Sequence, residues 1–364
     1  MKRLGPGVFR LMLALVVVLH HSTPLRLGAW AVGLFFCLSG YWIAEMWGRK
    51  YQKLDHPYVE FLVSRWWRLA PVLFVTTALA AILMHFNLLP GDLGAMKHLR
   101  WWCSQSLIAC STGNGRLLPP TWSLDVEMQF YIVAPLLIIL TLHLPKTARI
   151  AIAAIALTWC WLGNDHGVAD ESPRLDVWSG MFLLGILAST THWHPNKRLA
   201  IASGVATTIV FIAAAAMPMT RSWILLRGAT GHALTGPIAA TLTVGTILVA
   251  IPLAIATTAV PSNRFDRFLG DLSYPLYLFH WVMRDWYYAH LTSHPGVIHA
   301  LTLLFANILG ALAGALVLLF AVDRPLQRLR ARWIEFHGGT PVKMLESSKG
   351  TLPSPVDGIV GTVV

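Results

Sequence analysis

The first apolar segment carries an arginine near one end and two histidines at the other. Arg10 and His21 are eleven residues apart, which on an α-helix is about 20° past three full turns and about 16 Å of rise. They therefore share one face, whereas His20 lies about 80° away from it. Because an ionisable side chain is costly in lipid unless it faces protein or water, the spacing predicts a polar stripe. His21 could exchange a proton there near neutral pH; the alternative is an interfacial residue at a helix end.

A second polar stripe follows the paired prolines of "PPTWSLDVEMQFYIVAP". Ser123, Glu127 and Tyr131 recur every four residues and so share one helix face. If this helix runs from the outer side inward, Glu127 reaches the depth of His21. A carboxylate and a histidine at the same depth can form an acid–base pair. The alternative is that Glu127 belongs to a structural ion pair, for example with Arg174.

A third stripe occurs in "GDLSYPLYLFHWVMRDW", where Ser273, Tyr277, His280 and Arg284 follow helical spacing on a single face. Hydroxyl, imidazole and guanidinium groups in one row can orient a polar substrate. A structural role for His280, bonded to a neighbouring helix, is an equally good interpretation.

Two arginines, Arg65 and Arg68, lie one helical turn apart in "FLVSRWWRLAP". Two guanidinium groups on one face can hold the phosphates of a soluble donor that carries a nucleotide. The alternative is an ordinary cluster of positive charge on the cytoplasmic side, with interfacial tryptophans.

Composition identifies the elements that must position these groups. The chain has 364 residues, of which 55% are hydrophobic and 12% are charged, whereas soluble domains carry about twice that charge. The sequence predicts an all-α fold: a polytopic membrane helical bundle of about ten transmembrane helices, with no appended soluble domain. The net charge of +11 is interpreted as topology and not as a nucleic-acid-binding surface. The predicted spans are approximately 7–21, 28–47, 69–89, 122–143, 148–162, 176–191, 199–217, 236–259, 271–289 and 300–322.

Charge also predicts topology. With the N-terminus in the cytoplasm, most of the 28 lysines and arginines fall on the cytoplasmic side, as the positive-inside bias requires. Both termini are then cytoplasmic. No cleavable signal sequence is expected, because the first apolar stretch lacks a small-residue cleavage site. Residues 1–332 are predicted to form one membrane domain, and residues 333–364 a flexible cytoplasmic tail.

The four cysteines are too few for a disulfide framework. Cys37 and Cys160 fall within predicted spans and are expected to be packing residues. Cys103 and Cys110 share the predicted outer loop, where an oxidising compartment would allow a bridge.

Six short motifs occur in order and resemble those of the acyltransferase-3 family, integral membrane enzymes that O-acylate cell-surface and exported glycans. The first is the arginine-then-histidine helix already described. The other five are "FFCLSGY" (35–41), "RWWRLAP" (65–71), "WSLDVEMQFY" (122–131), "SYPLYLFHW" (273–281) and "VDRP" (322–325). The chain departs from the family pattern at Gly33 and Leu34, where an acidic residue is often found, and at Asp323, where glutamate is common.

The resemblance implies an acyl-CoA donor, most often acetyl-CoA, as co-substrate, with no permanently bound cofactor and no metal site. His21 and Glu127 are then the expected catalytic residues. The residues expected to bind the donor are Arg10, Arg65 and Arg68, and those expected to bind the acceptor are Trp122, Ser123, Arg174, Tyr277 and His280.

The resemblance also implies a place in the bacterial cytoplasmic (inner) membrane, in contact with membrane lipids. The expected acceptor is a lipid-linked or exported glycan, with exopolysaccharide preferred, and other membrane proteins of polysaccharide biosynthesis are candidate partners. Nucleic acid is not an expected partner. The acyl group can pass directly to a hydroxyl activated by His21, or through a covalent acyl-histidine.

Two other classes of function are alternatives. A transporter or flippase of a glycan precursor would also line its path with polar stripes, although the sequence has no evident inverted repeat and few broken helices. A structural membrane partner is the third interpretation. Acyl transfer, as opposed to vectorial movement without transfer, distinguishes the enzyme from the transporter.

Overall fold

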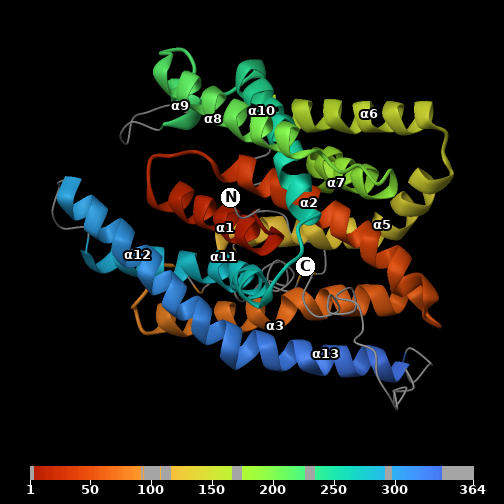
Figure 1. The fold of residues 1–364 in the computed structure, drawn as a ribbon. Helices are drawn as coiled ribbons and strands as arrows, with labels where there is room; N and C mark the ends of the chain where they lie inside the picture. Colours follow the sequence, from red (N-terminus) through yellow and green to blue (C-terminus); the bar gives the residue numbers. More distant parts are fainter. Residues whose placement is uncertain are drawn as a thin grey trace.

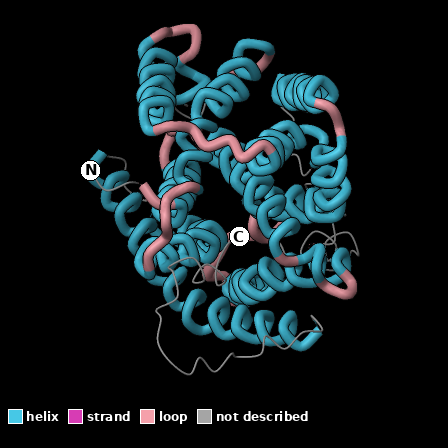
Figure 2. Tube along the Cα trace, turned by 45° about the vertical axis from the view of Figure 1, so that its right-hand side comes forward, coloured by secondary structure: helices cyan, strands magenta, loops and turns pink. Residues whose placement is uncertain are grey.

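A computed structural model describes residues 4–91, 93, 107, 116–165, 174–225, 234–291 and 297–337. Every regular element in these ranges is a helix, and the β-type pairing found there is one isolated bridge between Leu25 and Leu225. Figure 2 shows the helices and the loops that join them. The all-α prediction is therefore confirmed.

The helices follow one another closely along the chain. They are α1 (Pro6–Ser22), α2 (Gly28–Arg49), η1 (Tyr51–Lys53), α3 (Pro57–His85), η3 (Pro119–Thr121), α5 (Trp122–His143), α6 (Lys146–Asp165), α7 (Leu175–Thr190), α8 (Lys197–Ala216), α9 (Arg221–Ile224), α10 (Pro237–Thr258), α11 (Arg264–Leu291), α12 (Val297–Leu318), the π-helical turn η4 (Leu319–Asp323) and α13 (Arg324–His337).

Each of the ten predicted spans overlaps at least one of these helices, but the predicted number of membrane crossings is not confirmed. Within the described residues, six segments are long and apolar enough to span a membrane. They are Gly28–Lys53, Pro57–His85, Pro119–His143, Lys197–Ala216, Pro237–Thr258 and Leu301–Ile334. Helices α1 and α7 are also apolar but shorter.

Helix α3 begins well before the span predicted to start at residue 69. Pro57 occupies its first turn, where proline is tolerated because that N–H would have no helical partner. The helix continues through Pro71 to His85. Arg65 and Arg68 therefore lie within the body of a long helix and not in a connecting loop.

The central helices pack in pairs, α1 along α11 and α2 along α7 (Figure 1). Glycine permits the second contact, because a Cβ atom on Gly185 of α7 would overlap the carbonyl oxygen of Cys37 in α2. Such small-residue contacts let helix backbones approach closely in membranes. Cys37 and Cys160 are both buried within helices, as predicted.

The contact between α1 and α11 has both a polar and a small-residue component. The Asp266 carboxylate accepts hydrogen bonds from the backbone N–H groups of Gly7 (3.2 Å) and Val8 (2.9 Å), which would otherwise lack partners at the start of α1. A Cβ atom on Gly7 would overlap the Asp266 carbonyl oxygen. The start of α1 is thus fixed on α11, and this sets where Arg10 and His21 lie along it.

Helix α13 runs to His337, past residue 332, where the membrane domain was predicted to end. Residues 338–364 of the predicted tail lie outside the described residues. Cys103 and Cys110 also lie outside them, so the proposed bridge stays a prediction.

Candidate active site

A cavity lies among α1, α2, α3, α5 and α11 and encloses about 690 Å³, including the part open to its mouth. Its polar lining comes from all three stripes recognised in the sequence and from two further helices. The polar residues are Arg10, Ser39, Arg68, Ser123, Glu127, Ser273, Tyr274 and Tyr277. Helical spacing thus identified several groups that the fold brings to one space.

Glu127 is held by hydroxyl groups on one side of this cavity. Its Oε1 accepts hydrogen bonds from Ser39 Oγ (2.8 Å) and from Tyr131 OH (2.5 Å). Hydrogen bonds to an ionised carboxylate are strong and orient it. Tyr131 belongs to the predicted α5 stripe, whereas Ser39, from "FFCLSGY", was not predicted as a site residue.

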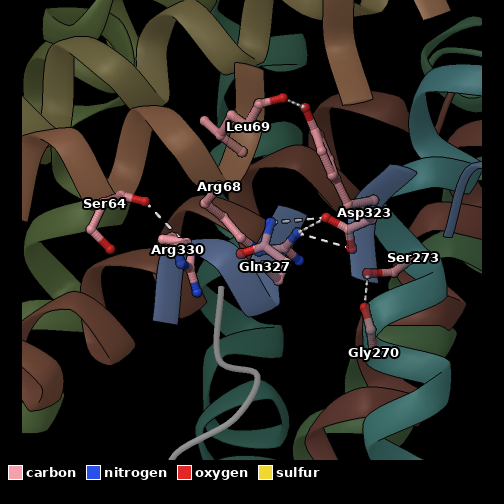
Figure 3. Close-up of polar contacts among 9 residues, drawn as sticks. Ser64, Arg68, Leu69, Gly270, Ser273, Asp323, Gln327 and Arg330 are labelled. Atoms are coloured by element: carbon pink, nitrogen blue, oxygen red, sulfur yellow. Dashed lines mark hydrogen bonds and ion pairs between the residues drawn. The ribbon is translucent and has the colours of Figure 1, made fainter. Parts of the chain in front are cut away.

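Arg68 reaches the cavity while paired with a carboxylate from the far end of the chain. Its Nη1 lies 3.1 Å from Asp323 Oδ1 and 3.4 Å from Oδ2 (Figure 3). Gln327 Nε2 donates to the same Oδ1 at 2.9 Å. Asp323 ends the π-helical turn η4, an irregularity that frequently occurs at functional sites. Asp323 is a second residue that sequence analysis missed, although the "VDRP" motif contains it.

Arg65 faces a different neighbourhood from Arg68. Its Nη2 donates to Tyr51 OH at 2.8 Å, and Tyr51 OH lies 2.8 Å from Ser64 Oγ. Arg65 is almost fully buried and is not among the residues that line the described cavity. Nearby, Arg330 Nη1 donates to the Ser64 carbonyl (Figure 3). The two predicted arginines therefore share a helix but differ in their access to the cavity.

His21 lies against α11, at the end of α1 opposite Arg10. Its ring stacks on His280 with centroids 5.4 Å apart and an angle of 20° between the planes. The ring meets Trp281 edge-on at 4.9 Å and His20 at 4.6 Å. Arg284 Nε donates to the His21 carbonyl at 2.8 Å. The α11 stripe thus holds both the ring and the backbone of His21.

His21 and Glu127 are not hydrogen-bonded to each other in the described part of the chain. The ring that stacks on His21 is that of His280, which is fully buried. Tyr277, which lines the cavity together with Glu127, has its ring 6.1 Å from that of His280. Tyr277 OH donates to the Pro120 carbonyl at 2.7 Å and lies 2.8 Å from Ser123 Oγ. If His21 and Glu127 act in the same reaction, they therefore do so without a direct hydrogen bond between them.

The other predicted residues occupy distinct positions. Arg174 pairs with Asp176 at the surface, and not with Glu127. Trp122 is buried in an aromatic cluster with Phe36 and Trp178. Asp125, on the opposite side of α5 from Glu127, pairs with Arg116 at 2.6 Å in a nearly fully buried contact.

A family model of the acyltransferase domain matches residues 4–322 of this chain. The chain belongs to the acyltransferase-3 family. This acyltransferase is 29% identical over 335 residues to BcsY of Komagataeibacter xylinus, named as a membrane-bound transacylase, covering 85% of this chain and 76% of BcsY. It is 24% identical over 214 residues to Nodulation protein 10 of Rhizobium leguminosarum bv. viciae, covering 50% of this chain and 56% of that protein. No solved structure matches it significantly.

Proposed function

We propose that this membrane acyltransferase moves an acyl group, preferentially acetyl, from cytoplasmic acyl-CoA to a hydroxyl of a surface or exported glycan, preferentially an exopolysaccharide. The observation that carries the proposal is the central cavity, which is lined by Arg10 and Arg68. Its lining residue Tyr277 lies next to His280, on which His21 stacks. The family supplies acyl transfer as the reaction class.

The donor end of the proposal rests on charge. Arg10 and Arg68 line the cavity, and Arg65 and Arg330 lie behind Arg68, so cationic groups accumulate around the pair formed with Asp323. Guanidinium groups bind phosphates through paired, charge-assisted hydrogen bonds. The phosphates of acyl-CoA would bind at this end, with the acyl-bearing arm extending along α1 toward His21.

In the proposed transfer, one proton moves from the sugar hydroxyl to His21 and then to the leaving thiolate. His21 accepts the proton of the sugar hydroxyl as its oxygen attacks the thioester carbonyl carbon. The tetrahedral intermediate then collapses, the C–S bond breaks, and the thiolate receives the proton from His21. Stacking on His280 and the hydrogen bond from Arg284 fix the orientation of His21. In the alternative route, His21 itself carries the acyl group before the hydroxyl attacks.

Glu127 would act on the reacting groups through the cavity, since it makes no direct bond to His21. Its carboxylate, held by Ser39 and Tyr131, would orient the donor arm or the acceptor and balance the charge of Arg10. Arg10 and Glu127 both line the central cavity, which supports this balancing role.

Purified protein in lipid, supplied with radiolabelled acetyl-CoA and candidate glycans, tests the proposal. Transfer of label to glycan is the expected result. Vectorial movement of the glycan without covalent label would contradict it and favour a transporter. Mass spectrometry of surface glycans from a deletion strain would identify the modified sugar.

A further inference from the structure

A second pocket, of about 620 Å³ including space open to solvent, lies beside His20 and shares no described lining residue with the central cavity. It is formed by the end of α1, the start of α2, the end of α6, α9 and the start of α10. In Figure 1, the connection between α1 and α2 and helix α9 lie at the left-hand end of the bundle. Nothing in the reaction proposed above uses this pocket.

The lining of this pocket combines aromatic rings with neutral hydrogen-bonding groups and one cationic residue, Arg26. The side chains that matter for the argument are His20, Arg26, Trp30, Asn164, Trp223 and Thr243. None of the lining residues that the structure describes is Asp or Glu. Indole rings pack against the C–H faces of sugars while their N–H groups donate to oxygen, and amide and hydroxyl groups bind sugar hydroxyls. This chemistry fits a pyranose ring better than a lipid chain or a cation.

The two tryptophans are held in place by neighbours. Trp223 Nε1 donates to Thr243 Oγ1 at 3.0 Å. Phe211 packs against both indoles, with ring centroids 5.4 Å from Trp30 and 5.8 Å from Trp223. By contrast, the buried Nε1 of Trp30 has no hydrogen-bond partner among the described residues. A buried donor without a partner is costly, so the Trp30 indole has an unmet hydrogen bond at the edge of this pocket.

The polar groups of the pocket are oriented as well. Asn164 Nδ2 donates to the Cys160 carbonyl at 2.8 Å, which leaves its Oδ1 as the acceptor oxygen. His20 Nδ1 lies 3.1 Å from the Leu25 carbonyl and must donate to it, because a carbonyl can only accept. Gly28 leaves room for the His20 ring, since a Cβ atom there would lie 2.5 Å from its Cδ2.

Backbone hydrogen bonds join the loop after α1 to the end of α9 beside this pocket. Arg26 N donates to the Ile224 carbonyl at 2.9 Å, and Leu25 forms the isolated bridge with Leu225. The loop after α1 is thereby tied to α9. His20, positioned by this loop, touches His21 with ring centroids 4.6 Å apart. A lining residue of this pocket is therefore in contact with the proposed catalytic histidine.

We propose that this pocket is the acceptor subsite, which binds a neutral pyranose ring of the glycan between Trp30, Trp223 and Asn164 and directs one hydroxyl past His20 toward His21. This inference rests on the proposed function. It places donor and acceptor in separate pockets, with His21 and His280 between them.

Direct binding tests the sugar site without requiring turnover. The full chain in lipid nanodiscs is mixed with methyl β-D-glucopyranoside or methyl α-D-mannopyranoside, and saturation-transfer difference NMR records the ring protons. Wild type is expected to give ring-proton signals with at least one of the two probes. Trp30→Ala and Asn164→Ala are expected to lose most of that signal. The control Trp159→Ala, which removes an exposed tryptophan from α6, should retain it. Equal signals in all four proteins would overturn the subsite.

Kinetics provides the second measurement. In the acyl-transfer assay, Trp30→Ala and Asn164→Ala should raise the acceptor KM about tenfold, which corresponds to about 1.4 kcal/mol, while the acyl-CoA KM stays unchanged. Trp30→Phe, which keeps a ring but loses Nε1–H, should have a smaller effect and guards against misfolding. Glycan transfer with wild-type acceptor KM in these variants would overturn the subsite and leave the proposed function intact. Sugar binding at the pocket without any acyl transfer would overturn the proposed function and leave the sugar site intact.

Discussion

Arg68 Nη1 lies 3.1 Å from Asp323 Oδ1, although 255 residues separate the two along the chain. Both side chains are nearly fully buried, so neither can replace its partner with water. The pair joins α3 to the junction of α12 and α13 while Arg68 still lines the central cavity. It therefore connects the integrity of the bundle to the charge at the proposed donor end.

Asp323→Ala should destabilise the protein strongly, because it leaves the Arg68 charge buried without its partner; such losses are about 3–5 kcal/mol. A lower thermal midpoint in lipid nanodiscs, with weaker acyl-CoA binding, is the expected result. Asp323→Glu, which keeps the charge, should restore most of both. If Asp323→Ala has the same thermal midpoint as wild type, the ion pair does not contribute to the stability of the protein.

His21→Ala should abolish acyl transfer, because loss of a general base lowers rates by about 10²–10⁴-fold. The donor should still bind, since His21 lies at the other end of α1 from Arg10. His20→Ala should retain turnover but raise the acceptor KM. Steady-state kinetics with both substrates varied separates these patterns. Equal loss of kcat in the two variants, at matched protein levels, would show that His21 contributes no more to turnover than His20 does.

Glu127→Gln tests whether the carboxylate charge matters beyond its hydrogen bonds. Glutamine can still accept from Ser39 and Tyr131, so the fold should be retained, while kcat should fall by at least about tenfold as the negative charge facing Arg10 is lost. Ser39→Ala, which removes one donor but keeps the charge, serves as the matched control and should have a smaller effect. Equivalent kcat values for Glu127→Gln and wild type would restrict Glu127 to a structural role.

Arg68→Ala and Arg65→Ala should differ in donor affinity. Arg68 lines the cavity, so its loss should weaken acyl-CoA binding directly, by about tenfold or more for a lost charge-assisted contact. Arg65 bonds to Tyr51 behind the cavity, so its loss should affect stability more than donor affinity. Isothermal titration with acetyl-CoA measures the first and thermal melting the second. Unchanged donor affinity in Arg68→Ala would refute its role in binding.

Topology can be tested with a thiol reagent that does not cross membranes. In intact cells, Cys103 or Cys110 should be labelled after mild reduction, whereas a cysteine introduced as Gln52→Cys should react only once the membrane is opened. Cys37 and Cys160 are buried and should add little background. The reverse pattern would place Arg65 and Arg68 outside, where cytoplasmic acyl-CoA cannot reach them.

Helical periodicity predicted much of the site because a polar stripe on an apolar membrane helix is costly in lipid and therefore faces the protein interior. Ser123, Glu127 and Tyr277, from two stripes, do line one cavity. Periodicity does not determine which stripes face one another. That His21 stacks on His280, and that Glu127 is bonded by Ser39, depends on how α1, α2, α5 and α11 pack.

Residues whose partners lie far away in the sequence could not be predicted either, because their contacts depend on how the helices pack. Asp323 looked like a variant position in a short motif, and its pairing with Arg68 follows only from the approach of η4 to α3. The pocket beside His20 was also not evident from the sequence. Trp30, Asn164 and Trp223 belong to three different helices and share no spacing that a linear pattern could show.

The attachment of α1 to α11 has a consequence for how the protein is made. Asp266, which holds the start of α1, follows Gly7 by 259 residues, so α1 is synthesised long before its partner. Until α11 arrives, Arg10 and His21 have to be sheltered by other helices, by water or by an insertion factor. The packing of α1 is thus completed only after α11 has been synthesised. A ribosome that stalls after α10 would leave a membrane protein that contains His21 but lacks the His280 ring on which His21 stacks.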